Sequence, residues 1–424
     1  MRYDTILFDL DGTLTESGPG IMHSAQIAAE KMGFTGVDPA AFARFIGPPL
    51  FQSFQALGMT EAQAEQAMGH YRAYFAHRGL FENAVYPGIP NLLRRLRAGG
   101  TGVYLATAKP QVFAERILAH FGLARFFDGV VGIALDDKAG DKPTIVRAAL
   151  PKRAGRAAMV GDRAYDIDGG KANGIDTVGV CYGYGTQAEL AHAGATHLVD
   201  TVTELAALLA PDVPIPRGFF VTVEGLDGSG KTTQIDALGH YLTQRGYEVV
   251  RTREPGGSPI AEQIRRVVLS PDNLGMHPVT EALLYAAARA EHVQAVVRPA
   301  LAAGKTVLCD RFVDSSVAYQ GGGRALGVDV VRGLNAPAVA GTMPDATLLL
   351  RVDAATAMGR RSRATASLDR IEVEREAFHQ RVFDAYEALA QLYPDRICAV
   401  DATAGVAEIT RQACARMDAM LAAR

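Results

Sequence analysis

Two series of short apolar runs, each alternating with helical patterns, constrain the fold of this chain most. The first series predicts strands at 5–8, 102–106, 129–132, 157–160 and 177–180, with helices at 111–121, 144–149 and 165–173. The second series predicts strands at 219–223, 248–252, 305–309, 346–352 and 396–400, with helices between them. Such alternation is typical of parallel sheets covered by helices on both faces. We therefore predict an α/β chain with two three-layer domains, whose ligands bind at the carboxyl ends of the strands.

A proline-rich seam separates the two series. The segment Pro211-Asp-Val-Pro-Ile-Pro216 places three prolines in six positions, which favours an extended connector. We predict one domain over 1–210, a linker over 211–217 and a second domain over 218–424. Residues 17–85 break the first alternation with helical periodicity alone, so we predict a helical cap at about 16–85, inserted after the first strand.

Composition and charge exclude several classes of protein. Hydrophobic residues are 48% and charged residues 21%, and 43 basic against 46 acidic residues give a net charge of −3 without a basic or acidic tail. We therefore expect no nucleic-acid partner. The four cysteines stand far apart without metal-site spacing, and no uncharged apolar run approaches the length of a membrane span. These features predict a soluble protein of the reducing cytoplasm without a membrane partner.

Acidic residues stand where strands of the first series end. Asp9 and Asp11 follow the first strand, and a carboxylate nucleophile beside a second carboxyl acting as acid and base suits attack on a phosphoryl group. A divalent cation would relieve the repulsion between two such acids. Taken alone, the motif could also be a metal-free Asp-Gly turn. Later strand ends carry further candidates for binding phosphate or metal: Thr107, Lys142, Asp162 and Asp166, with Asp168 as a competitor for Asp166.

A glycine-rich loop opens the second series. Gly225-Leu-Asp-Gly-Ser-Gly-Lys-Thr232 matches G-x-x-x-x-G-K-[ST] between a predicted strand and a predicted helix. Its backbone N–H groups can bind phosphate oxygens, Lys231 can neutralise charge, and the Thr232 hydroxyl can reach Mg²⁺. We predict ATP binding by the following residues: Gly225, Leu226, Asp227, Gly228, Ser229, Gly230, Lys231, Thr232 and Thr233.

An acceptor for the transferred phosphate is predicted at neighbouring strand ends. Arg253, which we expect to be buried, and Arg311 form a plausible clamp for a second phosphate. Tyr285 and Arg289, at i and i+4 on one helix face, could offer a ring and a donor to a base, although a core tyrosine and a solvated arginine explain the pair alone. Asp310, Ser316, Tyr319 and Gln320 follow the third strand of this series.

The first half resembles the haloacid dehalogenase-like phosphatases, in the branch of phosphoglycolate phosphatases and 5′-nucleotidases. The resemblance is carried by Leu7-Phe-Asp-Leu-Asp-Gly-Thr13, Phe45-Ile-Gly-Pro-Pro-Leu50, Ala106-Thr-Ala-Lys-Pro110 and Val160-Gly-Asp-Arg163. It implies that Asp9 forms an aspartyl-phosphate and that Asp11 protonates the leaving group and then activates water. It also implies that Thr107 and Lys142 bind phosphate. Asp9, the Asp11 carbonyl and Asp162 would hold Mg²⁺, and Asp166 would steady the water shell of the metal. The substrate would be a small phosphomonoester that the cap selects. A catalytically idle docking or dimerisation module remains the alternative.

The second half resembles thymidylate kinase over nearly all of 217–424. The resemblance is carried by Val223-Glu-Gly-Leu-Asp-Gly-Ser-Gly-Lys-Thr232, Thr252-Arg-Glu-Pro-Gly-Gly257, Asp310-Arg-Phe312, Ala318-Tyr-Gln-Gly-Gly-Gly-Arg324 and Ser367-Leu-Asp-Arg-Ile-Glu372. It implies dTMP as acceptor and a homodimer. By this resemblance Tyr285 stacks on thymine, Arg289 and Gln320 bind its edge, and Tyr319 crowds the 2′ position. Arg253 and Arg311 would then hold the dTMP phosphate, with Ser316 also at the substrate, and Asp310 would support Mg²⁺. A kinase for another nucleoside monophosphate remains the alternative.

The catalytic arginine is expected in a lid at about 356–370. In thymidylate kinases, which this half resembles, a catalytic arginine comes either from the phosphate loop or from the lid. The positions between the glycines of the phosphate loop are not basic here, so the resemblance implies the bacterial type, in which the lid supplies the charge that stabilises the transferring phosphoryl group. Arg360, Arg361 and Arg363 follow Met358-Gly359 there. By its distance from Asp369-Arg370, Arg363 is the first candidate and Arg361 the second.

Overall fold

The structure, a computed structural model, describes residues 2–46, 50–135, 141–361, 369–371 and 374–422. It divides into one unit of Met1–Pro214 with Thr243–Tyr247 and a second unit of Ile215–Leu242 with Glu248–Arg424. Each unit is built on a parallel sheet flanked by helices, which confirms the predicted fold class. No helix of the described part of the chain is both long and apolar enough to span a bilayer.

The first unit holds a six-stranded sheet in the order β5-β4-β1-β6-β7-β8. Its strands are β1 (Thr5–Phe8), β4 (Gly102–Pro110), β5 (Gly129–Ile133), β6 (Ala157–Gly161), β7 (Asp176–Val180) and β8 (His197–Val199). All neighbours pair in parallel. The first strand lies in the middle of the sheet, so the chain that leaves its carboxyl end is flanked by the ends of β4 and β6. Strand β8 is not anticipated by the apolar pattern.

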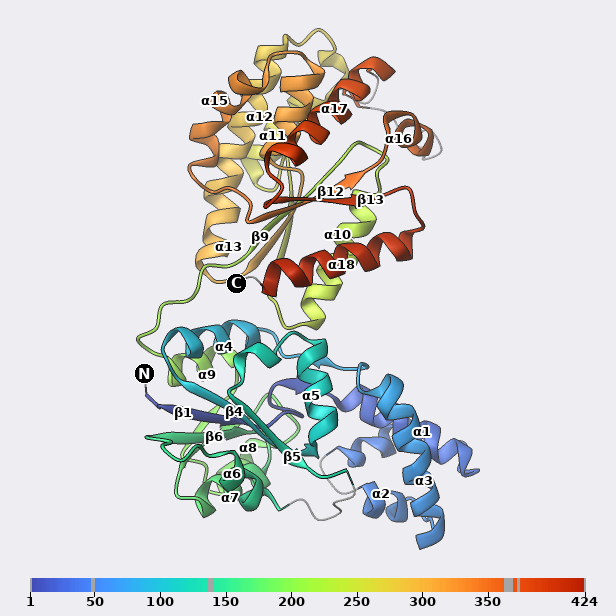
Figure 1. The fold of residues 1–424 in the computed structure, drawn as a ribbon, viewed down its shortest axis with the longest axis vertical. Helices are drawn as coiled ribbons and strands as arrows, with labels where there is room; N and C mark the ends of the chain where they lie inside the picture. The colour runs from blue at the N-terminus through green and yellow to red at the C-terminus, as the bar shows by residue number, and fades with distance from the viewer. Residues whose placement is uncertain (1, 47–49, 136–140, 362–368, 372–373, 423–424) are drawn as a thin grey trace. The chain divides into compact units, whose positions relative to one another are not determined.

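The alternation of side chains along β1 divides the core of this unit between the two faces of the sheet. Ile6 and Phe8 pack with buried residues of α4 (Ile89–Ala98), α5 (Gln111–His120) and α9 (Val202–Leu209). Leu7 points to the opposite face, where it packs with Ile145 and Val146 of α6 (Lys142–Ala149). Figure 1 shows α4 and α9 on one side of the strands and α6 and α7 (Ala164–Ala172) on the other. Burial of both faces fits a parallel sheet and its nearly continuous apolar strands.

The insertion after β1 is mainly helical, and short strands close it. Its helices include α1 (Gly18–Lys31), α2 (Leu50–Ala56) and α3 (Glu61–Tyr74). The prediction of helical periodicity alone is wrong at the boundaries, because β2 (Thr15–Glu16) pairs antiparallel with β3 (Ala84–Val85). This two-stranded ladder joins the beginning of the insertion to its end.

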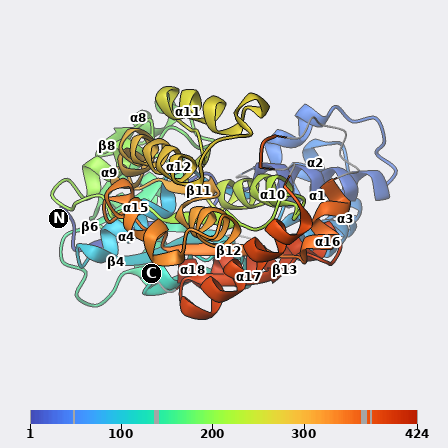
Figure 2. The ribbon, with the colours of Figure 1, turned by 90° about the horizontal axis from the view of Figure 1, so that it is seen from above.

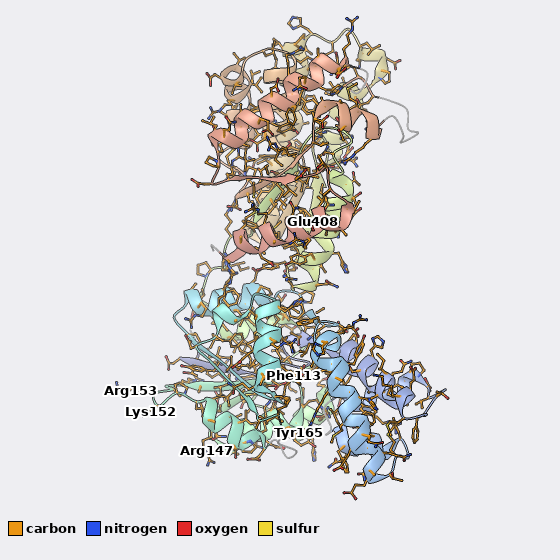
Figure 3. The ribbon with its side chains drawn as sticks, turned by 45° about the vertical axis from the view of Figure 1, so that its right-hand side comes forward. Phe113, Arg147, Lys152, Arg153, Tyr165 and Glu408 are labelled. Carbon is orange, nitrogen blue, oxygen red and sulfur yellow. The ribbon has the colours of Figure 1, made fainter. Side chains whose placement is uncertain are left out.

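The two ends of β6 differ in the side chains that surround them. Lys152 and Arg153 lie in the loop before this strand, whereas Tyr165 lies at the start of the helix that follows it, and Figure 3 shows the two groups apart. Arg147 projects from α6 on the outside of the unit. The basic loop therefore belongs to the amino edge of the sheet, away from the edge where the predicted site residues lie.

The second unit holds a five-stranded sheet in the order β10-β11-β9-β12-β13. Its strands are β9 (Phe220–Glu224), β10 (Val249–Arg253), β11 (Thr306–Asp310), β12 (Ala346–Arg351) and β13 (Ile397–Asp401). Each begins within one residue of its predicted start, and all neighbours pair in parallel. The strand before the glycine-rich loop is central, and β10 lies at the edge of the sheet.

Helices cover both faces of this second sheet. On one face lie α10 (Lys231–Gln244) and α18 (Val406–Ala422), joined where Thr410 donates a hydrogen bond to Gln234 at 3.0 Å. On the other lie α12 (Pro278–His292), its continuation through Val293–Val297 into α13 (Arg298–Ala302), and α15 (Val328–Val339). Helix α11 (Pro259–Leu269) lies beside α12, as Figure 2 shows from above. Helix α12 carries Tyr285 and Arg289, two of the three predicted base-binding residues.

Candidate active sites

Three buried carboxylates meet at the carboxyl edge of the first sheet. Asp9 follows β1, and Asp162 and Asp166 follow β6; one oxygen of each lies within 4.8 Å of the others. Lys142 bridges the group, with Nζ 2.7 Å from Asp9 Oδ1 and 2.5 Å from Asp166 Oδ1. The structure therefore brings together four residues that the sequence predicts from three separate segments. Asp168, the alternative to Asp166, is exposed on α7 and lies outside this cluster.

Local sequence explains how these side chains are held. Gly12 has φ +82°, and a Cβ there would lie 2.2 Å from Asp162 Oδ2, so the turn after Asp11 requires glycine. Asp141 caps α6 by accepting the Thr144 N–H at 3.1 Å, which begins the helix at Lys142. Asp166 accepts the Arg163 N–H at 3.1 Å in the first turn of α7, so its carboxylate is fixed by its own helix.

The electrostatics of this cluster fit a divalent cation. Burial raises the pKa of Asp9 to about 6, with the neighbouring carboxylates adding to the shift and Lys142 opposing it. Burial and the charges of Asp166 and Asp9 raise the pKa of Asp162 to about 8. Burial lowers the pKa of Lys142, but the charges of Asp166 and Asp9 outweigh this effect and raise it overall. The protein alone thus neutralises these acids poorly, and carboxylate oxygens in this arrangement suit Mg²⁺.

Asp11 has a cationic partner that sequence reasoning missed. Lys109 Nζ lies 2.7 Å from Asp11 Oδ2, and the lysine side chain is almost fully buried. The backbone N–H of Lys109 donates to the Thr107 hydroxyl at 3.2 Å. The predicted phosphate-binding threonine and this lysine therefore lie close together near the carboxyl end of β4. Thr107 lies two residues beyond the register pair Phe8–Leu105, beside the end of β1. Lys109 stands in a segment that carried the family resemblance, and that was the available signal.

One cavity of about 580 Å³ gathers the predicted residues of the second unit. It joins the glycine-rich loop to residues from β10, β11, α12 and the helical segment after β11. The predicted residues that line it are Asp227, Gly228, Gly230, Lys231, Thr232, Thr233, Arg253, Tyr285, Arg289, Asp310, Arg311, Ser316, Tyr319, Gln320 and Arg361. A nucleotide-binding loop and a second group of arginine, aromatic and amide side chains therefore open into the same space.

The loop has the geometry that phosphate binding requires. Gly225, Gly228 and Gly230 all have positive φ, and α10 begins at Lys231, so the helix N-terminus faces the cavity. Lys231 Nζ donates to the carbonyls of Gly225 and Leu226 at 3.1 and 2.9 Å. Burial and the charge of Arg311 lower the pKa of Lys231 to about 8. An anionic phosphate would supply the counter-charge that favours its protonated form.

Arg311 organises the side of the cavity next to the loop. It has φ +68°, an uncommon value for a non-glycine residue, and such strain is often found at functional sites. Its guanidinium donates to Asp227 Oδ1 at 2.6 Å and to the Tyr319 hydroxyl at 3.2 Å. Burial alone would raise the pKa of Asp227, but Arg311 and Lys231 outweigh it and hold that pKa below its usual range.

Asp310 is the residue at this strand end that fits a metal ligand. Its Oδ1 is buried without a hydrogen-bond partner among the described residues, and Thr232 lines the same cavity. A hydroxyl and a carboxylate oxygen are ligands that Mg²⁺ accepts.

Arg253 lines the cavity but is not buried, so that expectation is wrong. Its side chain is 54% exposed and pairs with Glu262 at 3.1 Å. The physical reason is that β10 is an edge strand, where the last residue is not covered by a neighbour. Arg265, missed from the sequence, also lines the cavity and donates to the Pro255 carbonyl at 2.7 Å. The acceptor end of the cavity therefore has one more arginine than predicted.

The predicted base-binding residues converge from α12 and the segment after β11. Arg289 is 1% exposed; its Nε donates to Glu254 at 2.7 Å, Nη1 to Ser316 at 3.0 Å and to Asn335, and Nη2 to the Phe312 carbonyl at 3.0 Å. The interpretation of Arg289 as a solvated arginine is therefore wrong. Tyr285 and Gln320 line the same part of the cavity.

The lid candidates are only partly described. Arg361, at the end of α16 (Ala354–Arg361), lines the cavity, whereas Arg363 lies outside the described residues. Arg360 also lines the cavity, but its Nη1 donates to the Ala402 carbonyl at 2.7 Å. Asp369 and Ile371, at the end of the predicted lid, line the cavity as well.

The two halves of the chain match different groups of known proteins. Residues 223–413 match the family model described as thymidylate kinase. The thymidylate kinase of Halalkalibacterium halodurans is 47% identical over 198 residues, which cover 46% of this chain and 94% of that protein. The thymidylate kinase of Pelotomaculum thermopropionicum is 50% identical over 187 residues, which cover 44% and 87%. The chain thus spans nearly all of these relatives with its second half.

The first half matches a different group. Residues 6–180 match the family model described as haloacid dehalogenase-like hydrolase. A predicted phosphatase from Clostridium acetobutylicum, whose crystal structure is known, has 41% sequence identity to this chain. The match covers 49% of this chain and 99% of that chain, with a TM-score of 0.46. A putative phosphatase from Clostridium difficile is 38% identical, with the same coverage and a TM-score of 0.47. The chain therefore belongs to the thymidylate kinase family through its second half, and joins that kinase domain to a haloacid dehalogenase-like hydrolase domain in its first half.

Proposed function

We propose that the second unit transfers the γ-phosphoryl group of ATP to dTMP and so produces dTDP. The observation that carries this proposal is the shared cavity, where Lys231 and Thr232 of the phosphate loop open toward Arg311, Tyr285 and Gln320. In such an arrangement two phosphates can be held close together, and catalysis is largely positioning and charge stabilisation.

Each group has a defined task in this kinase reaction. The loop and Lys231 bind the donor phosphates, while Arg253 and Arg311 hold the phosphate of dTMP so that its oxygen can attack in line. Tyr285 stacks on the base, and Arg289 and Gln320 bind its edge. A lid arginine, Arg363 or Arg361, stabilises the charge of the transferring group. Mg²⁺, held near Thr232 and Asp310, would neutralise phosphate charge.

The first unit is proposed to hydrolyse a small phosphomonoester. Asp9 attacks phosphorus and forms an aspartyl-phosphate while Asp11 protonates the leaving oxygen; Asp11 then accepts a proton from the water that cleaves the acyl phosphate. Thr107 and Lys142 bind the phosphoryl oxygens. Asp9, Asp162, Asp166 and the Asp11 carbonyl would hold Mg²⁺, whose charge favours approach of the phosphate. The ion pairs that Lys142 forms with both Asp9 and Asp166 support a hydrolase over an idle docking module.

The test uses the purified full chain with Mg²⁺. Formation of dTDP from dTMP and ATP is compared with the products of dCMP, dGMP and dAMP, and inorganic phosphate release is measured over a panel of phosphomonoesters. We expect dTMP to be the preferred kinase substrate, and we expect phosphate release that Asp9→Asn abolishes. Preference for another nucleotide would select the alternative kinase, and absence of hydrolysis across the panel would favour the docking module.

The setting of the enzyme is part of the same proposal. We place it in the cytoplasm, where ATP and dTMP are available and where its four cysteines, all free in the structure, would stay reduced. We also propose a homodimer of the kinase unit, supported by the exposed apolar side chains Val279 and Leu283 on α12. Light scattering at micromolar concentration distinguishes this dimer from a monomer.

A further inference from the structure

A buried carboxylate, Glu281, lies beside the amide of Gln320, which lines the kinase cavity. Glu281 is on α12 one turn before Tyr285, so that Glu281, Tyr285 and Arg289 share one helix face. Its exposure is 0%, and that of Gln320 is 2%. Gln320 Nε2 donates a hydrogen bond to Glu281 Oε1 at 2.9 Å. No sequence pattern singled out Glu281, which is therefore an unassigned residue in contact with a predicted base-binding residue.

Two arginines hold Glu281 in place. Arg324 Nη2 lies 3.1 Å and Arg370 Nη2 lies 2.7 Å from Glu281 Oε2. Arg370 is itself anchored, because its Nε donates to the Val268 carbonyl at 2.8 Å. A carboxylate paired with two guanidinium groups only accepts hydrogen bonds and has no freedom to turn away.

This pairing decides which way the Gln320 amide points. A glutamine side chain can present either its NH₂ or its carbonyl to a ligand, because a half-turn of the amide exchanges them. With Glu281 as an obligatory acceptor, the NH₂ must face Glu281 and Oε1 must face away. Among the described residues Oε1 has no hydrogen-bond partner, and Gln320 lines the cavity. The wall of the cavity therefore presents an acceptor at this point.

Arg289 supplies the opposite polarity next to it. An arginine has five N–H donors and no acceptor. Within the described part of the chain, four of those donors are taken by Glu254, Ser316, Asn335 and the Phe312 carbonyl, which leaves one N–H for a ligand. The cavity thus offers one donor from Arg289 and one acceptor from Gln320.

We propose that Glu281 is a positioning residue that fixes Gln320 as an acceptor and thereby selects bases with an N3–H group. Thymine and uracil carry an O4 acceptor beside an N3–H donor, which match Arg289 and Gln320. Cytosine carries an N4 amino donor beside an N3 acceptor, so both contacts become repulsive. Gln320 alone would rotate to suit either base, and Glu281 removes that freedom. The inference rests on the proposed dTMP kinase activity and adds the cause of its selectivity.

The test measures kcat and KM of the full chain for dTMP, dUMP and dCMP with saturating ATP and Mg²⁺. In Glu281→Gln the new amide can face Gln320 with either group, so both orientations become available. We expect KM for dTMP and dUMP to rise together by about tenfold with little change in kcat, because one buried hydrogen bond is weakened. KM for dCMP should stay the same or fall, so the preference for dTMP over dCMP should drop by at least the same factor.

Two further variants keep the proposal falsifiable. Glu374→Gln removes the other acidic partner of Arg324. Because Glu374 forms neither a hydrogen bond nor an ion pair with Gln320 in the described part of the chain, this change should leave the preference unchanged. Gln320→Met leaves Glu281 paired with both arginines and should abolish most of the preference, which covers the case in which Glu281→Gln does not fold. An unchanged preference in folded Glu281→Gln or in Gln320→Met overturns the proposal, as does an equal loss for all three nucleotides.

The same nucleotides are titrated by calorimetry with each variant. A wild-type chain that fails to phosphorylate dTMP would reject the proposed function. Binding ratios that do not change in Glu281→Gln would reject the present inference, whatever the outcome for catalysis.

Discussion

The two phosphoryl-transfer sites of this chain carry opposite charge. Around the first, the acids Asp9, Asp11, Asp162 and Asp166 stand against Lys109 and Lys142. The second cavity is lined by seven basic side chains against four acidic ones; the basic ones are Lys231, Arg253, Arg265, Arg289, Arg311, Arg360 and Arg361, and the acidic ones are Asp227, Glu254, Asp310 and Asp369. The first site therefore suits a cation as well as a phosphate, while the charge of the second suits several phosphate groups.

The pKa values express the same difference. In the first site burial raises the pKa of Asp9 to about 6 and that of Asp162 to about 8. An added positive charge would therefore stabilise the ionised form of both carboxylates. In the second site burial and the charge of Arg311 lower the pKa of Lys231 to about 8. An added negative charge would therefore stabilise the protonated form of the lysine. The contrast fits the proposed chemistry: a covalent route needs a carboxylate nucleophile, whereas direct transfer needs only positioning and cations.

The largest expected effect comes from Asp9→Asn, which removes the proposed nucleophile of the first site. Phosphate release should fall by about 10⁴-fold or more, because the amide cannot form the covalent intermediate. Formation of dTDP should be unchanged, since the residues of the kinase cavity all belong to the second unit. Asp168→Asn, a change of the exposed acid on α7, is the matched control and should retain full hydrolysis. Residual hydrolysis in Asp9→Asn close to that of the control would reject the covalent route.

The reciprocal change is Lys231→Ala in the phosphate loop. Formation of dTDP should fall by about 10⁴-fold, because the side chain that neutralises the donor phosphates is lost. Hydrolysis by the first unit should continue at the wild-type rate. The measurement is a pair of assays on one preparation, with circular dichroism as a check of folding. Loss of both activities in a folded protein would show that the two sites are not independent, and would break the comparison.

A smaller effect is expected from the lid. Arg363→Ala should lower kcat by about 10³-fold with little change in dTMP affinity, because the arginine contacts charge that develops in the transition state. Arg361→Ala is the second variant, since Arg361 lines the cavity. Arg360→Ala serves as the control, because its guanidinium donates to the Ala402 carbonyl. Normal turnover in both Arg363→Ala and Arg361→Ala would remove the lid from the catalytic scheme.

Sequence reasoning succeeded where the chemistry follows from strand ends. The parallel alternation predicted that Asp9, Asp162 and Lys142 would meet at one edge, and they do, because all strands of such a sheet end on the same side. The phosphate loop was equally predictable, since its glycines serve a local backbone shape. In both cases the information lies within a few neighbouring residues and in the order of the strands.

It failed where a side chain depends on partners that are distant in the sequence. Glu281 stands at the start of an apolar run, and its partners Gln320, Arg324 and Arg370 are 39 or more residues away. Lys109 pairs with Asp11 across 98 positions. Arg253, at the end of a predicted strand, was expected to be buried, but its exposure depends on the place of that strand in the sheet, and β10 is at the edge. Pairing and strand order are properties of the folded chain that a local pattern does not contain.

The smallest predicted effect concerns the substrate that distinguishes the two sites. The kinase consumes dTMP, and a phosphatase that used dTMP equally well would drain that substrate and reduce the output of dTDP. A shared chain raises the local concentration of any common intermediate, which makes such competition worse. We therefore predict that the first unit prefers another phosphomonoester, a different nucleotide or a small metabolite such as phosphoglycolate, by at least about tenfold in kcat/KM. That margin is about 1.4 kcal/mol of transition-state binding, which a few cap contacts can supply.

The measurement is phosphate release from dTMP, from other nucleoside monophosphates and from phosphoglycolate, with Asp9→Asn as the blank. The Lys231→Ala chain is used, so that phosphorylation does not remove dTMP during the assay. If dTMP were the best substrate, the two sites would oppose each other on one nucleotide. Net dTDP formation would then depend on which site is saturated with dTMP first. A regulated pair of opposing activities would be the better explanation of the fusion.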